Sequence, residues 1–195
     1  INLATDVYRR AAAMNNISVV GVDFHIGSQL TEIQPFVDAM DRLLVLVDQL
    51  QALGIKLQHI DIGGGLGVRY QDETAPTAAA YLEALLPRIA GRHETLVLEP
   101  GRSITANAGV LLTRVEYLKS NGSKNFAIVD AAMNDMLRPA LYQAWMDIQP
   151  VTTNHMPTET FDVVGPVCET GDFLGKDRDL SIVQGDILCL FSAGA

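Results

Sequence analysis

The sequence contains three glycine-bearing loops: His25-Ile26-Gly27-Ser28, Gly63-Gly64-Gly65-Leu66-Gly67 and Glu99-Pro100-Gly101-Arg102. Each loop follows a short apolar run that is typical of a β-strand, and the loops recur at an interval of one strand plus one helix. When parallel strands lead into such loops, the loops open at the same carboxyl edge of a sheet or barrel, where these folds build their binding sites. The pattern therefore predicts part of an enzyme.

The segments between the loops alternate between strand and helix patterns. Three apolar runs predict strands at residues 18–24, 57–62 and 95–98. Apolar residues recur at helical spacing over 36–50, and a second helix is predicted over 77–90. Thr31 followed by Gln34 predicts a capping box at the start of the first helix, and Gly54 is placed to end it.

After Ala106 the pattern changes to apolar runs separated by turn-rich stretches, with one helix predicted near Asn134–Trp145. The apolar runs predict strands at residues 110–118, 126–129, 161–164 and 187–191. We therefore expect two domains, an α/β domain over 1–105 and a mostly antiparallel β domain over 106–195. Three strands do not close a barrel, and the chain begins at Ile1, so we expect an internal piece of a longer protein.

Composition limits the class of protein. The chain has 195 residues, 48% of them apolar, without an unbroken apolar run long enough to span a membrane. Its net charge is −9, and its 14 basic residues are scattered, which argues against a nucleic-acid or membrane surface and favours a small-molecule ligand. The two cysteines, Cys168 and Cys189, do not form a disulfide framework, so we expect free thiols and a cytoplasmic location.

The glycine loop at Gly63–Gly67 permits backbone N–H groups to approach an anion closely, as a phosphate requires. A tight strand-to-helix turn without a ligand is an equal alternative for a lone glycine run. The loop lacks the Lys-Ser/Thr of a nucleoside triphosphate site and the spacing of a dinucleotide site. His25, at another strand end, is either a hydrogen-bonded structural residue or a catalytic one.

The third loop places an acid and a guanidinium side by side. Glu99 is suited to hold a protonated ring nitrogen, and Arg102 is suited to bind an anionic group of a ligand. A local surface ion pair is the alternative. Because three such loops converge on one edge, the pattern favours a phosphorylated, nitrogen-containing cofactor.

Four motifs carry a resemblance to a known family: Val22-Asp23-Phe24-His25-Ile26-Gly27-Ser28, Asp61-Ile62-Gly63-Gly64-Gly65, Glu99-Pro100-Gly101-Arg102 and Gly165-Pro166-Val167-Cys168-Glu169. In order and spacing they resemble the pyridoxal-phosphate decarboxylases of the alanine-racemase-like fold. Within that family, Cys168-Glu169-Thr170 and the segment Asn134–Tyr142 resemble diaminopimelate decarboxylases more closely than ornithine decarboxylases. The resemblance covers nearly the whole chain.

The resemblance implies an α/β fold, the later part of a TIM-like (β/α)8 barrel followed by part of a mostly antiparallel β domain. It implies pyridoxal 5′-phosphate as cofactor and no metal. The cofactor-binding residues by resemblance are His25, Ser28, Gly63, Gly64, Gly65, Glu99, Gly101 and Arg102. The implied catalytic residues are Cys168 as proton donor, His25 stacked on the cofactor ring and Glu99 at the pyridine nitrogen. The implied substrate-binding residues are Arg102, Arg138, Tyr142 and Glu169.

The implied activity is decarboxylation of meso-2,6-diaminopimelate to L-lysine, the last step of lysine biosynthesis, by a homodimer with shared active sites. Decarboxylation of ornithine or carboxynorspermidine, or a non-catalytic homologue that binds pyridoxal phosphate, are the alternatives. Family members hold the cofactor through a Schiff-base lysine on an early barrel strand. The lysines here match no such motif, so we expect this chain by itself to be inactive; they are Lys56, Lys119, Lys124 and Lys176.

Overall fold

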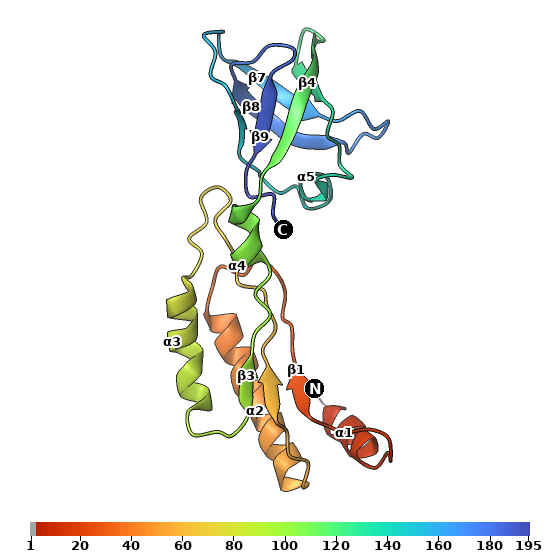
Figure 1. Ribbon diagram of the computed structural model, residues 1–195, viewed down its shortest axis with the longest axis vertical. Helices are drawn as coiled ribbons and strands as arrows, with labels where there is room; N and C mark the ends of the chain where they lie inside the picture. The colour runs from red at the N-terminus through yellow and green to blue at the C-terminus, as the bar shows by residue number, and fades with distance from the viewer. Residues whose placement is uncertain (1–2) are drawn as a thin grey trace. The chain divides into compact units, whose positions relative to one another are not determined.

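The computed structural model describes residues 3–195 and divides the chain into two compact units. The first unit holds the residues up to Val68 together with 74–103, and the second holds 69–73 and 104–195. Helices dominate the first unit and strands dominate the second (Figure 1). None of the helices in the described part of the chain is both long enough and apolar enough to cross a membrane.

The first unit is built around a three-stranded parallel sheet with the strand order β1-β2-β3. Its elements are, in chain order, α1 (Ala4–Ala12), β1 (Gly21–Asp23), α2 (Gln34–Ala52), β2 (His59–Asp61), α3 (Ala78–Ile89) and β3 (Thr95–Val97). The short helices α4 (Arg102–Thr105) and η1 (Ala106–Ala108) follow. In the sheet, Asp23 pairs with Asp61 and Asp61 with Val97, so the strands end level with one another. This confirms the predicted parallel strands and the two helices between them.

Helix α2 supplies most of the first unit's core, because one of its faces is continuously apolar. Phe36, Met40 and Leu50 are completely buried on that face, and Ile60 of β2 packs in the same cluster. Helix α3 joins this core through Tyr81, whose ring meets Phe36 edge to face with 4.9 Å between the ring centroids. The helices are thereby fixed on the sheet by side-chain packing.

The sequence predicted a start signal and a stop signal for α2, and only the stop signal is confirmed. The predicted capping box is wrong: the residue before the helix is Ile33, which makes no side-chain cap, and the amide of Gln34 donates to Asp38 at 2.8 Å instead. The predicted stop is confirmed, since the helix ends at Ala52 and Gly54 follows with φ of 83°.

The second unit is a six-stranded sheet with the strand order β6-β9-β4-β5-β7-β8. Its elements are β4 (Leu111–Ser120), β5 (Asn125–Val129), α5 (Leu137–Tyr142), β6 (Ile148–Pro150), β7 (Glu159–Val164), β8 (Phe173–Leu180) and β9 (Ile187–Leu190). The strands pair antiparallel, as predicted, except that β5 and β7 are parallel. The sheet curls so that its end strands approach: a Cβ on Gly175 of β8 would lie 2.6 Å from Ile148 Cδ1 of β6.

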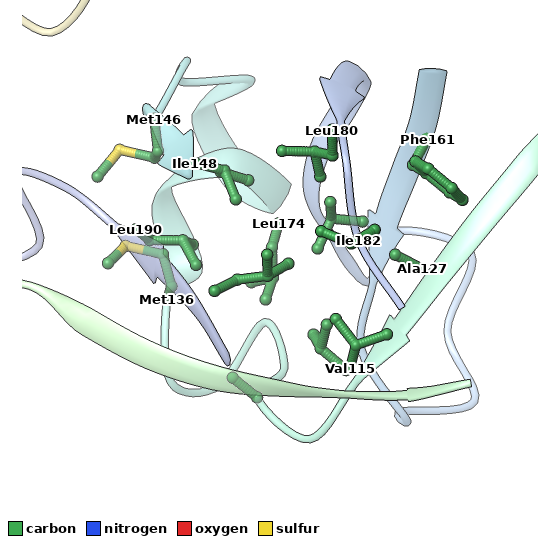
Figure 2. Close-up of a cluster of buried hydrophobic side chains, with 14 residues drawn as sticks. Val115, Ala127, Met136, Met146, Ile148, Phe161, Leu174, Leu180, Ile182 and Leu190 are labelled. Atoms are coloured by element: carbon green, nitrogen blue, oxygen red, sulfur yellow. The ribbon is translucent and has the colours of Figure 1, made fainter. Parts of the chain in front are cut away.

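The curled sheet encloses the core of the second unit. Figure 2 shows Leu174 among side chains from several strands, with Leu190 and Val115 around it. Val115, Leu174, Leu188 and Leu190 are completely buried there. Alternation along β4 and β9 turns Val115, Leu188 and Leu190 inward, as expected for a sheet with one face in solvent.

Three features of the second unit differ from the sequence prediction. The helix predicted near Asn134–Trp145 is shorter, because α5 spans Leu137–Tyr142 and Gln143 follows in the left-handed conformation with φ of 54°. Strands β6 and β8 were not predicted. Strand β8 has the sequence Phe-Leu-Gly-Lys-Asp-Arg-Asp-Leu, whose charged second half hides the apolar alternation.

Replacing Leu174 with alanine is expected to lower the free energy of unfolding by about 3 kcal/mol, because a buried leucine leaves a cavity. The measurement is urea unfolding of the full chain followed by fluorescence of Trp145, the one tryptophan of the sequence. Leu112→Ala in β4 is the control, since Leu112 is 58% exposed and its loss should change the same quantity by less than about 0.5 kcal/mol. Equal effects of the two substitutions would contradict the described core.

Candidate active site

The three parallel strands of the first unit bring the three glycine-bearing loops to one edge. Backbone hydrogen bonds continue past the strand ends: the Glu99 N–H donates to the Gly63 carbonyl at 2.9 Å, and the Leu30 N–H donates to the Gly65 carbonyl at 2.9 Å. Leu30 also forms a parallel bridge with Leu66. The central loop is therefore held on both sides by its neighbours.

Glycine is required in the central loop because neighbouring backbone lies where a Cβ would be. A Cβ on Gly64 would lie 2.3 Å from the Glu99 carbonyl oxygen, and one on Gly65 would lie 2.3 Å from the Gly27 carbonyl oxygen. Gly63 has φ of 65°, which side-chain-bearing residues rarely adopt. These glycines allow the backbones of three loops to lie in contact. This contact accounts for the consecutive glycines better than a simple strand-to-helix turn does.

His25 lies against the same loop. The Gly64 N–H points at His25 Nδ1 over 3.4 Å, a long hydrogen bond in which the ring nitrogen accepts. An accepting Nδ1 places the proton of the neutral imidazole on Nε2. His25 as a whole is exposed at this edge.

Ser28 and Arg102 come together although 74 residues separate them. The Arg102 guanidinium donates to Ser28 Oγ from Nε at 3.3 Å and from Nη2 at 3.2 Å. Gly101, beside it, is exposed, and a Cβ there would meet nothing within 4 Å. A hydroxyl and a fixed positive charge at the loop edge form a suitable environment for an anionic group.

Three carboxylates gather at the ends of the three strands. Oxygens of Asp23, Asp61 and Glu99 all lie within 4.8 Å of one another. Asp61 also accepts the Gly63 N–H at 2.8 Å, which ties its carboxylate to the glycine loop. Sequence reasoning identified Glu99 alone; the strand register, Asp23 opposite Asp61, is the signal that would have found the others. Such a concentration of negative charge favours a cationic group of a ligand.

In the second unit, Cys168 and Glu169 lie on the turn between β7 and β8. Both side chains are exposed, and Cys168 is a free thiol. The Thr170 hydroxyl donates to Glu169 Oε1 at 3.0 Å. Cys189, by contrast, lies in β9, where burial raises the pKa of its thiol with a smaller contribution from Asp147. The accessible thiol of the unit is therefore that of Cys168.

Helix α5 carries Arg138 and Tyr142 one helical turn apart. The Arg138 guanidinium lies over the ring of Tyr70, 4.7 Å from its centroid, and Tyr142 is 68% exposed. Tyr70 was not predicted as part of this group, because its sequence context carries no motif. The contact is a cation–π interaction, which favours this position of the guanidinium.

A cavity of about 450 Å³ lies beside α5 and the 165–172 turn. Its lining residues include Ala140, Gln143, Trp145, Thr170, Lys176 and Arg178. Arg178 is stacked 4.6 Å from the centroid of the Trp145 ring, and burial lowers its pKa despite the opposing charges of Asp147 and Asp177. Residues of α5 and of the end of the turn line this cavity together, so the two segments lie next to each other within the second unit.

The chain was compared with known proteins. The model of the family described as "Pyridoxal-dependent decarboxylase, pyridoxal binding domain" matches residues 1–106. The chain is 61% identical to diaminopimelate decarboxylase of Pseudomonas aeruginosa over 195 residues, 100% of this chain and 47% of that protein. It is 58% identical to diaminopimelate decarboxylase of Vibrio cholerae, over 98% of this chain and 46% of that protein.

A solved structure gives the same result. The structure of diaminopimelate decarboxylase from Helicobacter pylori complexed with L-lysine matches with a TM-score of 0.92 and 40% identity, covering 100% of this chain and 48% of that one.

The matched family model is that of a pyridoxal-binding domain, and its span includes the parallel sheet that gathers glycines, acids and a histidine at one edge. The chain belongs to the pyridoxal-dependent decarboxylase family. Its parallel sheet corresponds to part of the family's pyridoxal-binding barrel, as the resemblance implied. The chain spans about half the length of the curated relatives that it matches.

The strand edge of the first unit fits the family's cofactor, pyridoxal phosphate. The close-packed glycine loop keeps side chains away from this edge, and Arg102 with Ser28 offers a cation and a hydroxyl for a phosphate. The carboxylate cluster with Glu99 suits a protonated ring nitrogen. The donor set therefore matches the two polar ends of that molecule.

Replacing Gly64 with alanine is expected to weaken binding of pyridoxal phosphate by about 10- to 100-fold, because the new Cβ would displace the Glu99 backbone. This corresponds to about 1–3 kcal/mol of strain. The measurement is an absorbance titration of the full-length protein with the cofactor.

Gly54→Ala is the control for this substitution. Gly54 also has a positive φ, 83°, but ends α2, outside the three loops. Its replacement should lower thermal stability and leave the cofactor dissociation constant within about twofold. A similar loss of affinity in both variants would mean that Gly64 acts through stability alone.

Proposed function

We propose that the protein containing this chain decarboxylates meso-2,6-diaminopimelate to L-lysine with pyridoxal phosphate as cofactor. The proposal rests above all on one observation: Glu99 stands in a carboxylate cluster directly beside the glycine loop. The identity of 61% to a diaminopimelate decarboxylase along the whole chain supports this substrate over ornithine. The lysine bound in the Helicobacter pylori relative is the product expected of the same reaction.

In this proposal the strand edge of the first unit binds and orients the cofactor. Backbone of Gly63–Gly65, the Ser28 hydroxyl and the Arg102 guanidinium bind the phosphate end, with Gly101 allowing close approach. The His25 ring, anchored by the Gly64 N–H, stacks on the pyridine. Each of these groups positions the ring and keeps it from rotating.

Glu99 holds a proton on the pyridine nitrogen. The bound cofactor supplies an electron sink that stabilises the negative charge left at the substrate α-carbon when carbon dioxide leaves. Asp23 and Asp61 add negative charge near Glu99, which favours the protonated, cationic ring nitrogen over the neutral one. This stabilisation acts on the transition state, since the charge develops there.

Recognition of the substrate requires groups for its non-reacting end. Arg138, stacked on the Tyr70 ring, and Tyr142, one helical turn further along α5, bind the distal carboxylate. Glu169 binds the distal ammonium. Ornithine lacks the distal carboxylate and therefore does not make this contact.

The Cys168 thiol donates the proton that replaces the lost carboxylate at the α-carbon. Its position on an exposed turn gives it access to a substrate. A thiol suits this step because it carries a proton that it can transfer to a carbanion. We further propose a cytoplasmic homodimer in which Cys168 and Glu169 of each subunit serve the partner's site.

The substrate assignment predicts that kcat/KM for meso-2,6-diaminopimelate exceeds that for ornithine by at least about 100-fold. The measurement is steady-state release of carbon dioxide by the full-length protein loaded with pyridoxal phosphate. Carboxynorspermidine is assayed in parallel. Faster turnover of either rival would overturn the substrate, and binding of the cofactor without turnover of any of the three would support a non-catalytic role.

Glu99→Gln is expected to lower kcat for diaminopimelate by about 100-fold or more while the cofactor dissociation constant changes by less than about tenfold. The neutral amide no longer favours the protonated ring nitrogen, so kcat should change more than the cofactor dissociation constant. Glu83→Gln on the exposed face of α3 is the matched control and should leave kcat unchanged. An unchanged kcat in Glu99→Gln would remove this carboxylate from the mechanism.

A further inference from the structure

The turn that carries Cys168 and Glu169 is exposed along 166–170, yet its end is anchored by a buried acid. Asp172 is 3% exposed. Its carboxylate accepts the Met133 N–H at Oδ1 over 2.6 Å and the Val167 N–H at Oδ2 over 2.8 Å. A buried carboxylate without partners would be costly, so these amides are the reason that the charge is tolerated there.

The backbone of Asp172 also closes the turn on itself. Its carbonyl accepts the Gly165 N–H at 3.1 Å, and its own N–H donates to the Glu169 carbonyl at 3.1 Å. The side chain and the main chain of one residue thus contact the turn at its beginning, near its middle and close to its end. Cys168 lies between the positions that these bonds fix.

Gly165 shows how closely the segments approach. A Cβ there would lie 2.4 Å from Asp172 Oδ2 and 2.7 Å from the Ala131 carbonyl oxygen. The glycine therefore permits three backbone segments to lie in contact. They are the start of the turn, the end of the turn and the segment that precedes α5. Any side chain at this position would push the carboxylate away from its donors.

The hydrogen bond from the Met133 N–H links Asp172 to a segment outside the turn. Met133 lies four residues before α5 begins at Leu137, and the intervening segment is itself closed by the Ala132 N–H donating to Asp135 at 2.9 Å. Helix α5 carries Arg138 and Tyr142. One carboxylate therefore bonds at the same time to the turn with the thiol and to the segment that leads into the helix.

We propose that Asp172 is a positioning residue that sets the Cys168–Glu169 turn and helix α5 in a fixed geometry relative to each other. This inference rests on the proposed function, in which helix α5 and the Cys168–Glu169 turn each serve a substrate site, the turn that of the partner subunit. Asp172 acts through the backbone of Val167 and Met133 and has no direct part in the chemistry. A carboxylate is required because both of its oxygens accept, whereas an amide of the same shape offers one acceptor and turns an N–H toward the other donor.

The first experiment compares Asp172→Asn with Asp162→Asn in the full-length protein loaded with pyridoxal phosphate. Asp162 is a matched control: it is 4% exposed in the same unit and accepts from Lys124 at 2.7 Å and from the Asp177 N–H at 2.9 Å. Both substitutions should lower the melting temperature. Activity is measured well below both melting temperatures and expressed per cofactor-loaded site.

We expect Asp172→Asn to lower kcat by about 10- to 100-fold, since a displacement near 1 Å in a reacting group has effects of this size. Asp162→Asn should keep kcat within about twofold. Equal kcat values for Asp172→Asn and the unsubstituted protein would overturn the proposal, because a residue that only stabilises the fold would give that result. The assay uses whichever substrate the unsubstituted protein decarboxylates, so an error in the substrate does not affect the comparison.

The second experiment is independent of activity and follows amide hydrogen exchange in the protein with and without cofactor. The Met133 and Val167 amides should be protected in the unsubstituted protein. In Asp172→Asn, protection should fall by about tenfold or more in both 165–172 and 131–137, while Asp162→Asn leaves both segments unchanged.

Free exchange of these amides in the unsubstituted protein, or a loss confined to one segment, would overturn the coupling, even if Asp172→Asn does not fold well enough for assay. Failure of the proposed function would give a different result. The unsubstituted protein would then turn over no substrate, while its amide exchange would still show the expected protection.

Discussion

Close backbone contact at the glycine loop is the constraint on which the first unit's site depends. Gly63, Gly64 and Gly65 lie against carbonyl oxygens of Phe24, Glu99 and Gly27, at distances that leave no room for a Cβ. Only glycine allows three consecutive strand ends to meet in this way. The result is an edge on which residues 74 positions apart, such as Ser28 and Arg102, form a hydrogen bond. The carboxylates of the strand ends gather there for the same reason.

In the second unit, buried acids hold the irregular backbone, together with Gly165 beside Asp172. The strands of this unit are interrupted by turns and by residues with positive φ, including Asp177 in β8. At these points backbone N–H groups leave the regular pairing and need acceptors. Asp162 accepts the Asp177 N–H, and Asp172 accepts N–H groups at both sides of its turn. Buried carboxylates therefore hold the irregular segments, and the segment held by Asp172 carries Cys168 and Glu169.

Sequence patterns predicted the elements well where one face is uniformly apolar. The strands of the first unit, α2, α3 and most of β4 and β9 follow directly from apolar periodicity. The pattern missed β8, because its bulge at Asp177 and its charges break the alternation that a regular strand would show. It also overextended α5, since nothing local announces the left-handed Gln143 that ends that helix. The capping box failed because Ile33, and not Thr31, precedes the helix.

The sequence by itself determined the fold class, the family resemblance and the identity of the candidate residues, because motif order and apolar period are local properties of the chain. It named Glu99 but did not assign Asp23 and Asp61 to the same cluster, and it named Arg138 without Tyr70. It passed over Asp172 entirely. These depend on strand register and on contacts between distant segments, and only the tertiary structure brings such segments together.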